Sequence, residues 1–521
     1  MVAGTALPPP FAVPPSGRPP AEADGSAPAE AWGSVWPRLT APARWRIVPA
    51  LDQDPRAVAA IQSERGRIVL LAAVTMLAVA LGGFDVDLRA APVATLCAYA
   101  RTYRRHLVAL ATLLFLCRHA FWIDTALIRD IVHQEGLADR IDMGLLLPGV
   151  LATVVLAVTG LLTLWPRLAG GALARFPTTV LIAAVFGLAI AAQSPVAAGL
   201  PRVLLWSLLL AFQPYLWFLA YALADRHMLT DRPLWQHLGV FHPFWGSSMT
   251  PFGKGLSYLD RYEAKTAADL AVTQLKGLKL ACWTLILAAS LRAFGLTVHG
   301  MLGVPRFERV FLGFVDGVPE PRSLCWAGLA AFFVEDVLTM TVWGGAIVSC
   351  ARLAGFRLLR NTYRPLEART LAEFWNRYYF FYKELLVDHF FYPTFFRWFR
   401  KNKTLRVFFA TFMAACVGNL LFHFIRDIRF VAQLGWWQAV SGDASHAFYT
   451  LLLALGVGIS QARGQSRERT GGWLRGRLLP CLWVVLFFCV LHVFDAPTDR
   501  IHTIGQRLHF LSYLFGVESW T

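Results

Sequence analysis

The sequence predicts an all-helical protein that crosses a membrane many times, and three observations support this fold class. Hydrophobic residues make up 56% of the 521 positions and charged residues only 16%, which is too apolar for a soluble multi-domain protein. Several apolar runs approach the roughly 20 residues that a helix needs to cross about 30 Å of hydrocarbon. The runs also lack the strand-like alternation of a transmembrane β-barrel. We therefore expect about nine to eleven membrane helices, together with re-entrant or interfacial helices.

The chain divides into a short tail and one long membrane domain. Residues 1–45 are rich in Pro, Ala and Gly and lack apolar periodicity, so they predict a disordered cytoplasmic tail. Residues 46–521 predict a single polytopic transmembrane domain. Its expected spans lie near 68–83, 107–122, 143–165, 178–192, 203–224, 278–294, 324–350, 405–425, 448–460 and 478–493.

The formal net charge is +16, yet the basic residues gather in short stretches that flank the apolar runs. Such clustering is typical of the positive-inside rule and of contact with anionic headgroups, and it argues against nucleic acid as a partner. It predicts a multi-pass protein of the inner (cytoplasmic) membrane. The eight cysteines are scattered singly, mostly within apolar runs, so neither a metal site nor a disulfide framework is predicted.

Residues 233–262 interrupt the series of spans. They are rich in Gly, Pro and aromatic side chains and show no sustained helical stripe. They predict a re-entrant or interfacial segment, because irregular backbone at membrane depth must be buried in protein or line a wet cavity. The alternative is an amphipathic surface segment in which Trp235 and Trp245 serve as anchors at the membrane interface.

The stretch 374–424 holds the strongest candidates for chemistry. It begins FWNRYYFFYKELLVDHFFYPTFFRWFRKNK, crosses a basic patch, and ends in an apolar run that carries His423. The dense aromatic pattern of residues 370–398 predicts an amphipathic helix that lies at the interface or dips into the core. A carboxylate, Asp388, and a histidine in such surroundings are unusual for residues that only fill hydrocarbon.

The order and spacing of residues in this stretch resemble the membrane-bound O-acyltransferase (MBOAT) family. The matching positions are Phe374–Tyr379, Val387–Pro393 and Gly418–His423, in which an aromatic block, an Asp before aromatic residues and Pro, and a histidine-bearing helix follow one another. The likeness is to the bacterial branch that acetylates alginate or transfers D-alanine to teichoic acids. Close resemblance covers roughly a tenth of the chain, and a weaker likeness in topology extends over residues 233–460.

Three positions depart from the family pattern. Val387 stands where the family has an arginine, His389 where it has a tyrosine, and Tyr379 where some bacterial branches have a second histidine. A further similarity lies after the Gly- and Pro-rich segment, where Lys276 and Lys279 resemble a basic helix start of the family. The departures keep open a second hypothesis, in which the chain is a non-catalytic MBOAT-like scaffold.

The resemblance implies transfer of an acyl group, for example acetyl, from a thioester to a hydroxyl, with His423 as general base. Asn419 lies one turn earlier on the same helix face, where it would orient the imidazole or hold the thioester carbonyl. Asp388 is expected to be a second catalytic or orienting group. A structural pair between His423 and Asn419, packed between helices, is the alternative. Substrate-binding candidates are Asn376, Arg377, Tyr379 and His389.

The implied co-substrate is acyl-CoA or an acyl carrier protein thioester, and no other cofactor is expected. The acceptor would be a hydroxylated polysaccharide, lipid or small molecule, and an accessory periplasmic or carrier protein is a further expected partner. The basic surfaces would steer an anionic donor to the cytoplasmic face.

A third hypothesis is a transporter or flippase that uses Arg118, Glu335, Asp336 and His423 as pathway groups. No paired broken helices occur in corresponding halves of the chain, which argues against it. Adjacent side chains on a helix point about 100° apart, so Glu335 and Asp336 cannot both face one pocket. We expect one of them to pair with an arginine and the other to face a polar channel.

Overall fold

The computed structural model describes residues 47–119, 123–168, 176–239, 241, 243–246, 249–463, 472–495 and 502–517. The expected tail, residues 1–45, lies outside this part of the chain, as does the side chain of Arg118. All regular elements of the described residues are helical, and the one β-like feature among them is an isolated bridge between Glu263 and Phe356. The predicted all-helical fold is confirmed.

Seven of the described helices are long and apolar enough to cross a membrane, by length and composition. They are Glu64–Gly82, Met143–Leu168, Leu200–Met228, Ala267–Met301, Arg322–Leu353, Lys403–Arg426 and Leu474–Leu491. Ala90–Tyr99 and Pro177–Gln193 are shorter apolar helices. A multi-pass membrane protein is therefore supported, and each of these seven overlaps an expected span. The expected span 448–460 falls within a 19-residue helix that is not among the seven.

The first half of the chain is built from helices of moderate length. They are α1 (Pro55–Gln62), α2 (Glu64–Gly82), α3 (Ala90–Tyr99), α4 (Arg104–His119), α5 (Thr125–Gln134), α6 (Met143–Leu164), α8 (Pro177–Gln193), α9 (Leu200–Phe212), α10 (Leu216–Met228), α11 (Leu234–Gly239) and α12 (Leu256–Tyr262). Short 3-10 turns extend several of them, for example η4 (Trp165–Leu168) after α6 and η6 (Gln213–Tyr215) between α9 and α10.

The second half contains the longest helices and four π-helical turns. Its helices are α13 (Ala267–Gly295), α14 (Phe307–Val315), α15 (Arg322–Leu353), α16 (Leu371–Tyr378), α17 (Phe380–Leu386), α18 (Tyr392–Phe395), α19 (Lys403–Phe412), α20 (Asn419–Arg426), α21 (Arg429–Leu434), α22 (Trp436–Gly442), α23 (Ala444–Ala462), α24 (Leu479–Leu491) and α25 (Ile504–Leu514). The π-turns are η7 (Leu296–Met301), η9 (Val387–Phe391), η10 (Met413–Gly418) and η11 (Leu474–Leu478).

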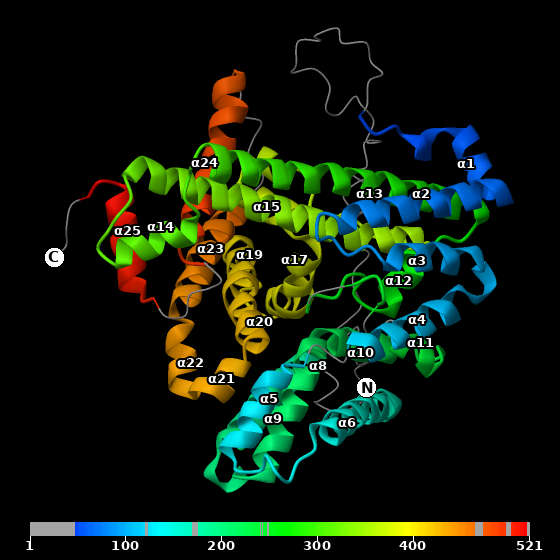
Figure 1. The fold of residues 1–521 in the computed structure, drawn as a ribbon, viewed down its shortest axis with the longest axis horizontal. Coiled ribbons are helices and arrows are strands. Elements are labelled where there is room, and N and C mark those ends of the chain that lie inside the picture. The colour runs from blue at the N-terminus through cyan, green and yellow to red at the C-terminus, as the bar shows by residue number, and fades with distance from the viewer. Residues whose placement is uncertain are drawn as a thin grey trace, which may run out of the picture.

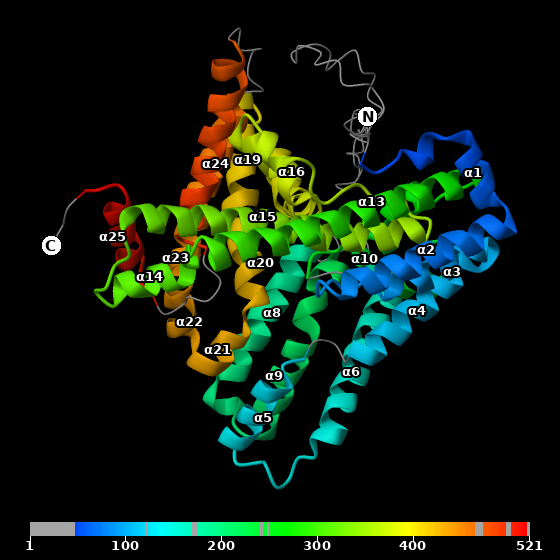
Figure 2. The ribbon, with the colours of Figure 1, turned by 45° about the horizontal axis from the view of Figure 1, so that its top comes forward.

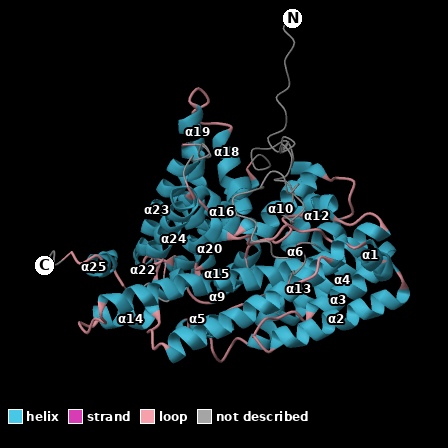
Figure 3. Cartoon of the chain, turned by 90° about the horizontal axis from the view of Figure 1, so that it is seen from above, coloured by secondary structure: helices cyan, strands magenta, loops and turns pink. Residues whose placement is uncertain are grey.

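The long helices α13 and α15 lie side by side and extend across the molecule (Figure 1). Helices α14 and α25 lie at one end of this pair and α1 at the other (Figure 3). Helices α19, α20, α23 and α24 run steeply across the pair (Figure 2). Small residues permit the close contact within the pair, since a Cβ added at Gly277 would lie 3.1 Å from the Leu353 nitrogen and from the Ser349 carbonyl oxygen.

Local capping explains where several helices begin. Ser63 accepts a hydrogen bond from the Gly66 nitrogen at the start of α2, and Asn402 accepts one from the Leu405 nitrogen at the start of α19. Thr370 does the same for Glu373 at the start of α16. These side-chain oxygens satisfy backbone N–H groups that have no partner within the helix.

The aromatic stretch 370–398 is not the single amphipathic helix that its pattern predicted. It forms α16, α17 and α18, because Tyr379 is non-helical, with φ −136° and ψ 81°, and the π-turn η9 separates α17 from α18. The stretch lies where three hydrophobic clusters meet. Trp375 packs against the cluster of α8–α10 and against that of α14, α15 and α24, and Tyr379 packs against the first of these and against that of α2, α13 and α15.

The segment 233–262 is largely buried within the protein where it is described, although Pro233 and Arg261 are exposed. Phe244 and Trp245 are 3% exposed and Phe252 is 1% exposed. The Trp245 indole N–H donates to the Phe252 carbonyl oxygen at 3.3 Å. The interpretation of Trp245 as an anchor at the membrane interface is therefore wrong, whereas irregular backbone buried in protein agrees with the structure. Trp235 stacks on His106 with ring centroids 4.3 Å apart.

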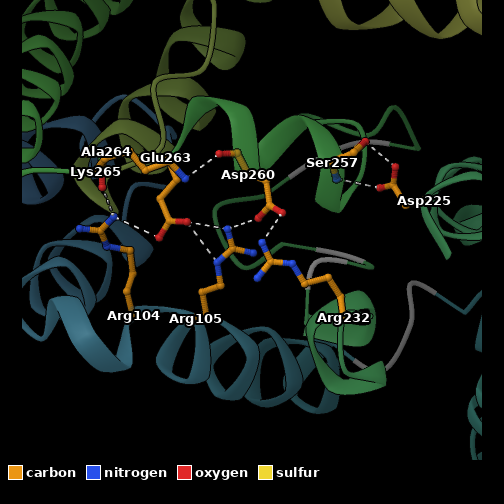
Figure 4. Close-up of polar contacts among 9 residues, drawn as sticks. All are labelled: Arg104, Arg105, Asp225, Arg232, Ser257, Asp260, Glu263, Ala264 and Lys265. Atoms are coloured by element: carbon orange, nitrogen blue, oxygen red, sulfur yellow. Dashed lines mark hydrogen bonds and ion pairs between the residues drawn. The ribbon is translucent and has the colours of Figure 1, made fainter. Parts of the chain in front are cut away.

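Paired charges fasten this segment to α4 (Figure 4). The Arg104 guanidinium donates to Glu263 at 3.3 Å, and Arg105 binds the other Glu263 oxygen at 2.5 Å. Arg105 also binds Asp260, and Arg232 reaches the second Asp260 oxygen at 3.2 Å. Because Arg104, Arg105, Asp260 and Glu263 are largely withdrawn from solvent, removal of one partner would leave a poorly compensated charge. This ion-pair network holds the end of the segment against α4.

Candidate functional site

His423 lies in the middle of α20, and this helix directly follows the π-turn η10. It is partly exposed, whereas its neighbours Phe422 and Phe424 are buried, at 5% and 9% exposure. A π-turn inserts one extra residue into a helical turn and is often found at functional sites. The sequence thus places an accessible imidazole between two phenylalanines that are packed into the core.

Asn419 and Tyr382 connect the histidine helix to the aromatic stretch. The Tyr382 hydroxyl donates a hydrogen bond of 2.6 Å to the Asn419 side-chain oxygen, and both side chains are buried. Burial raises the pKa of Tyr382, so its hydroxyl remains a donor at neutral pH. The Tyr382 ring meets the His423 ring edge to face, with centroids 6.0 Å apart. The structure therefore brings Asn419, Tyr382 and His423 together.

A second imidazole, that of His446 on α23, lies against His423. The two ring centroids are 4.3 Å apart and the ring planes are inclined by 47°. His446 Nδ1 lies 3.1 Å from an Asp495 carboxylate oxygen, just after α24, and His446 Nε2 is buried without a hydrogen-bond partner. Because a carboxylate accepts hydrogen bonds, this contact assigns the proton to Nδ1 and leaves a lone pair on Nε2.

His446 and Asp495 were not among the candidates that the sequence indicated. His446 lies on a later helix than His423, Asp495 lies just after α24, and neither belongs to a recognisable motif. The available signal was that His446 stands three residues before Tyr449, on which it stacks with centroids 5.4 Å apart. Such spacing shows only that the two share a helix face.

A third histidine, His492, forms a separate pair with Asp336 of α15. Its Nδ1 contacts the Phe488 carbonyl oxygen at 2.7 Å and its Nε2 contacts Asp336 at 3.3 Å, while the Tyr378 hydroxyl donates to the same Asp336 oxygen. Burial lowers the pKa of His492, but Asp336, Asp495 and the Phe488 carbonyl together raise it by more, so the net shift is upward. Both nitrogens of His492 are engaged, in contrast to His446.

Glu335 faces elsewhere, as the helical geometry predicted. It contacts His299 at 3.2 Å and Arg306 at 3.6 Å. The two adjacent carboxylates of α15 therefore serve different clusters, and the expected arginine partner is Arg306.

Asp388 has its own set of partners, on the π-turn η9. Its Oδ2 lies 2.7 Å from Lys254 Nζ and accepts a hydrogen bond of 2.7 Å from the Tyr221 hydroxyl. Lys254 also binds Glu384 at 2.8 Å, and Lys383 binds Glu384 at 2.5 Å. Burial raises the pKa of Glu384, yet the two lysines lower it by more, to about 2. Burial likewise lowers the pKa of Lys254, but Asp388 and Glu384 raise it by more.

His389, the next residue, has different hydrogen-bond partners, although it shares Tyr221 as a neighbour with Asp388. Its Nδ1 lies 2.7 Å from the Thr178 hydroxyl, and its ring lies beside those of Tyr221 and Trp217, with centroids 4.7 and 5.9 Å away. Burial lowers the pKa of His389 to about 4, so the imidazole is neutral at physiological pH.

The π-turns η9 and η10 meet at Phe390 and Gly418. A Cβ added at Gly418 would lie 2.6 Å from the Phe390 ring, so only glycine permits this approach. The contact sets the Asp388 turn directly against the turn that precedes His423.

The remaining candidates lie on or beside α16. Arg377 pairs with Glu373 one turn earlier and donates to the Arg364 carbonyl oxygen at 3.3 Å. Asn376 is exposed. Tyr379 packs against Tyr382 and Phe252, with ring centroids 5.4 and 6.2 Å away. Tyr379 is connected to the His423 cluster through Tyr382, whose ring contacts the rings of both Tyr379 and His423.

Comparison of the chain with models of known protein families found no match, and comparison with curated proteins found none either. Within the described ranges, no group of three or more His, Cys, Asp and Glu residues is arranged to hold a metal ion. The chemistry open to the site is therefore argued from its own side chains, which are imidazole, carboxylate, amide and phenol groups.

Proposed function

We propose that this multi-pass membrane protein is an O-acyltransferase that moves an acyl group from a thioester to a hydroxyl, with His423 as general base. The observation that carries the proposal is the setting of His423, a partly exposed imidazole on a π-turned helix, fastened through Asn419 and Tyr382 to the aromatic stretch. The motif resemblance of residues 374–424 to MBOAT proteins supports the same reaction class.

In the proposed reaction, His423 takes the proton of the acceptor hydroxyl while the oxygen attacks the thioester carbonyl carbon. The resulting tetrahedral intermediate carries negative charge on the former carbonyl oxygen. Asn419 is suited to stabilise this charge, because its side-chain oxygen is occupied by Tyr382 and its amide N–H groups are donors. The carbon–sulfur bond then breaks, and the imidazolium returns the proton to the leaving thiolate. The products are an ester and a free thiol.

The donor in this proposal is acyl-CoA or an acyl carrier protein, reached from the cytoplasmic side of the inner membrane. The basic stretch 397–406 supports this side, because arginines and lysines concentrate in cytoplasmic loops. The acceptor is a polysaccharide, lipid or small molecule with a hydroxyl group. Asp388, whose charge is compensated by Lys254, is suited to shaping the site through its helical turn, and direct reaction is not required of it.

The test is mass spectrometry of the lipids and glycans of cells that carry the chain, the chain with His423→Ala, or neither. We expect ester-linked acyl groups, labile to hydroxylamine, in the first strain and their loss by about 100-fold or more in the second, since general-base catalysis contributes about 10²–10⁴-fold. His133→Ala, an exposed histidine of α5, is the matched control and should leave the esters unchanged.

Equal membrane levels of the variants, measured by immunoblot, show that insertion is intact. Unchanged esters in the His423→Ala strain would overturn the role of His423. Equal esters in the strain that lacks the chain would overturn the acyltransferase proposal and favour the scaffold hypothesis.

A further inference from the structure

The pair formed by His446 and Asp495 is the feature of the site that the proposed reaction does not use. His446 is 14% exposed and Asp495 33% exposed, measured on their side chains, so the contact is only partly shielded from solvent. His446 Nε2 is buried and has no partner, although a buried polar atom is normally hydrogen-bonded. An unsatisfied nitrogen beside a second imidazole calls for an explanation.

We propose that His446 and Asp495 position His423 for catalysis, an inference that rests on the proposed function. Asp495 holds His446 with its proton on Nδ1, so that the Nε2 lone pair is available to accept a ring N–H of His423. The two ring centroids are 4.3 Å apart and the ring planes are inclined by 47°, and we infer that a reorientation of the His423 ring during turnover makes this bond. The other nitrogen of His423 then carries the lone pair that faces the acceptor.

This arrangement follows the logic of a triad, in which a carboxylate orients an imidazole and the oriented ring determines the tautomer of the acting group. No atom is gained or lost, since the N–H proton of His423 stays on its nitrogen while the opposite nitrogen takes and returns the hydroxyl proton. His446 is accordingly a positioning residue, and Asp495 positions His446.

Other titratable groups also face this pair and enter any dependence on pH. Arg426 on α20 is paired with Asp427 at 2.8 Å. The groups contributed by the remaining packed elements are Tyr382 on α17, Tyr449 on α23, Tyr378 on α16, Asp336 on α15 and His492 after α24. All of them are retained in the substitutions below, so a change can be attributed to Asp495 or His446.

The first experiment needs no acyl chemistry. The purified full chain in lipid nanodiscs is treated with diethyl pyrocarbonate, which modifies neutral imidazole, and the labelling of His423 is followed against pH by peptide mass spectrometry. Asp495→Asn removes the negative charge beside His446 while keeping the size of the side chain, and Asp495→Glu keeps the charge. We expect Asp495→Asn to shift the midpoint of His423 labelling to lower pH by about one unit, and Asp495→Glu to restore it.

The second experiment uses acetyl-CoA as the donor and measures release of CoA thiol. We expect His446→Gln to lower kcat by about 10-fold with little change in the KM for acetyl-CoA, because His446 does not bind the donor. In a plot of kcat against pH, the decrease of kcat at acidic pH (the acidic limb) should move to lower pH in Asp495→Asn, as the labelling midpoint does. His133→Gln is the matched control, since the exposed His133 of α5 is not among the groups that face this pair, and it should leave that limb in place.

The outcomes separate this inference from the proposed function. A labelling midpoint that stays fixed in Asp495→Asn overturns the inference whether or not the chain transfers acyl groups. Loss of activity in His423→Ala with full activity in His446→Gln overturns the inference and leaves the general base in place. If Asp495→Asn fails to insert, His446→Gln and Asp495→Glu provide the same comparison.

Discussion

The clusters around Asp388 and around His423 lie on π-turns that touch each other, yet their chemistry differs. Around Asp388, Lys254 bridges two carboxylates and Lys383 adds a further positive charge. Around His423, the Tyr382 hydroxyl bonds the Asn419 amide, and His446 Nε2 is buried without a hydrogen-bond partner. Compensated charges fasten helices together in the first cluster, whereas in the second we propose that an imidazole with an unbonded nitrogen, beside an accessible one, takes part in proton transfer.

The largest effect on this comparison is expected from Lys254→Met. Among the described residues, it leaves the Tyr221 hydroxyl as the partner of Asp388 and Lys383 as the partner of Glu384, and a charge left poorly compensated in a partly buried site is costly. We expect a loss of about 3 kcal/mol in the free energy of unfolding, measured by denaturation in detergent. Lys254→Arg keeps the positive charge and should lose far less. Equal stability of the Met and Arg variants would show that the ion pairs do not fasten these helices.

A second effect, which is smaller than that of Lys254→Met near neutral pH, concerns the protonation of His389. Its pKa is about 4 in the folded protein against 6.5 for an ordinary histidine, so protonation favours the unfolded state. The contribution is fully present above pH 6.5 and is lost as the pH falls toward 4, by about 1.4 kcal/mol for each pH unit. The difference in unfolding free energy between the unchanged chain and His389→Phe should therefore change over that range. A difference that is constant with pH would contradict the buried, neutral imidazole.

The smallest effect is expected from Gly418→Ala, which tests whether the two clusters depend on each other. The added methyl group would meet the Phe390 ring at 2.6 Å, so one π-turn must move. We expect a cost of about 1 kcal/mol, the lower end for an overpacked contact, together with reduced acyl transfer. Gly149→Ala on α6, where a Cβ meets nothing within 4 Å, is the control. Unchanged stability and activity in Gly418→Ala would mean that the turns do not need this contact.

The sequence predicted the parts of this molecule that depend on local patterns. Apolar length located the spans, such as that of α15, and the Gly- and Pro-rich composition of residues 233–262 indicated irregular buried backbone. The separate partners of Glu335 and Asp336 followed from helix geometry.

The parts that escaped prediction depend on contacts between distant segments. Helical periodicity gives the face on which His423 lies, but it does not say which later helix packs there, so His446 and Asp495 were missed. The π-turns before Asn419 and around Asp388 were missed as well, because their residues do not differ in type from those of an ordinary helix. The ion pair between Lys254 and Asp388 joins two segments whose partnership no local pattern reveals.

The most direct test of the central claim is the rate at which the purified full chain in nanodiscs transfers acetyl from acetyl-CoA to a hydroxyl, compared with His423→Ala. The measurement follows free CoA thiol together with hydroxylamine-labile acetyl in added membrane lipid and glycan fractions. We expect both products from the unchanged chain and a loss of about 100-fold or more in the variant at equal thermal stability. Equal rates for the two proteins would contradict it.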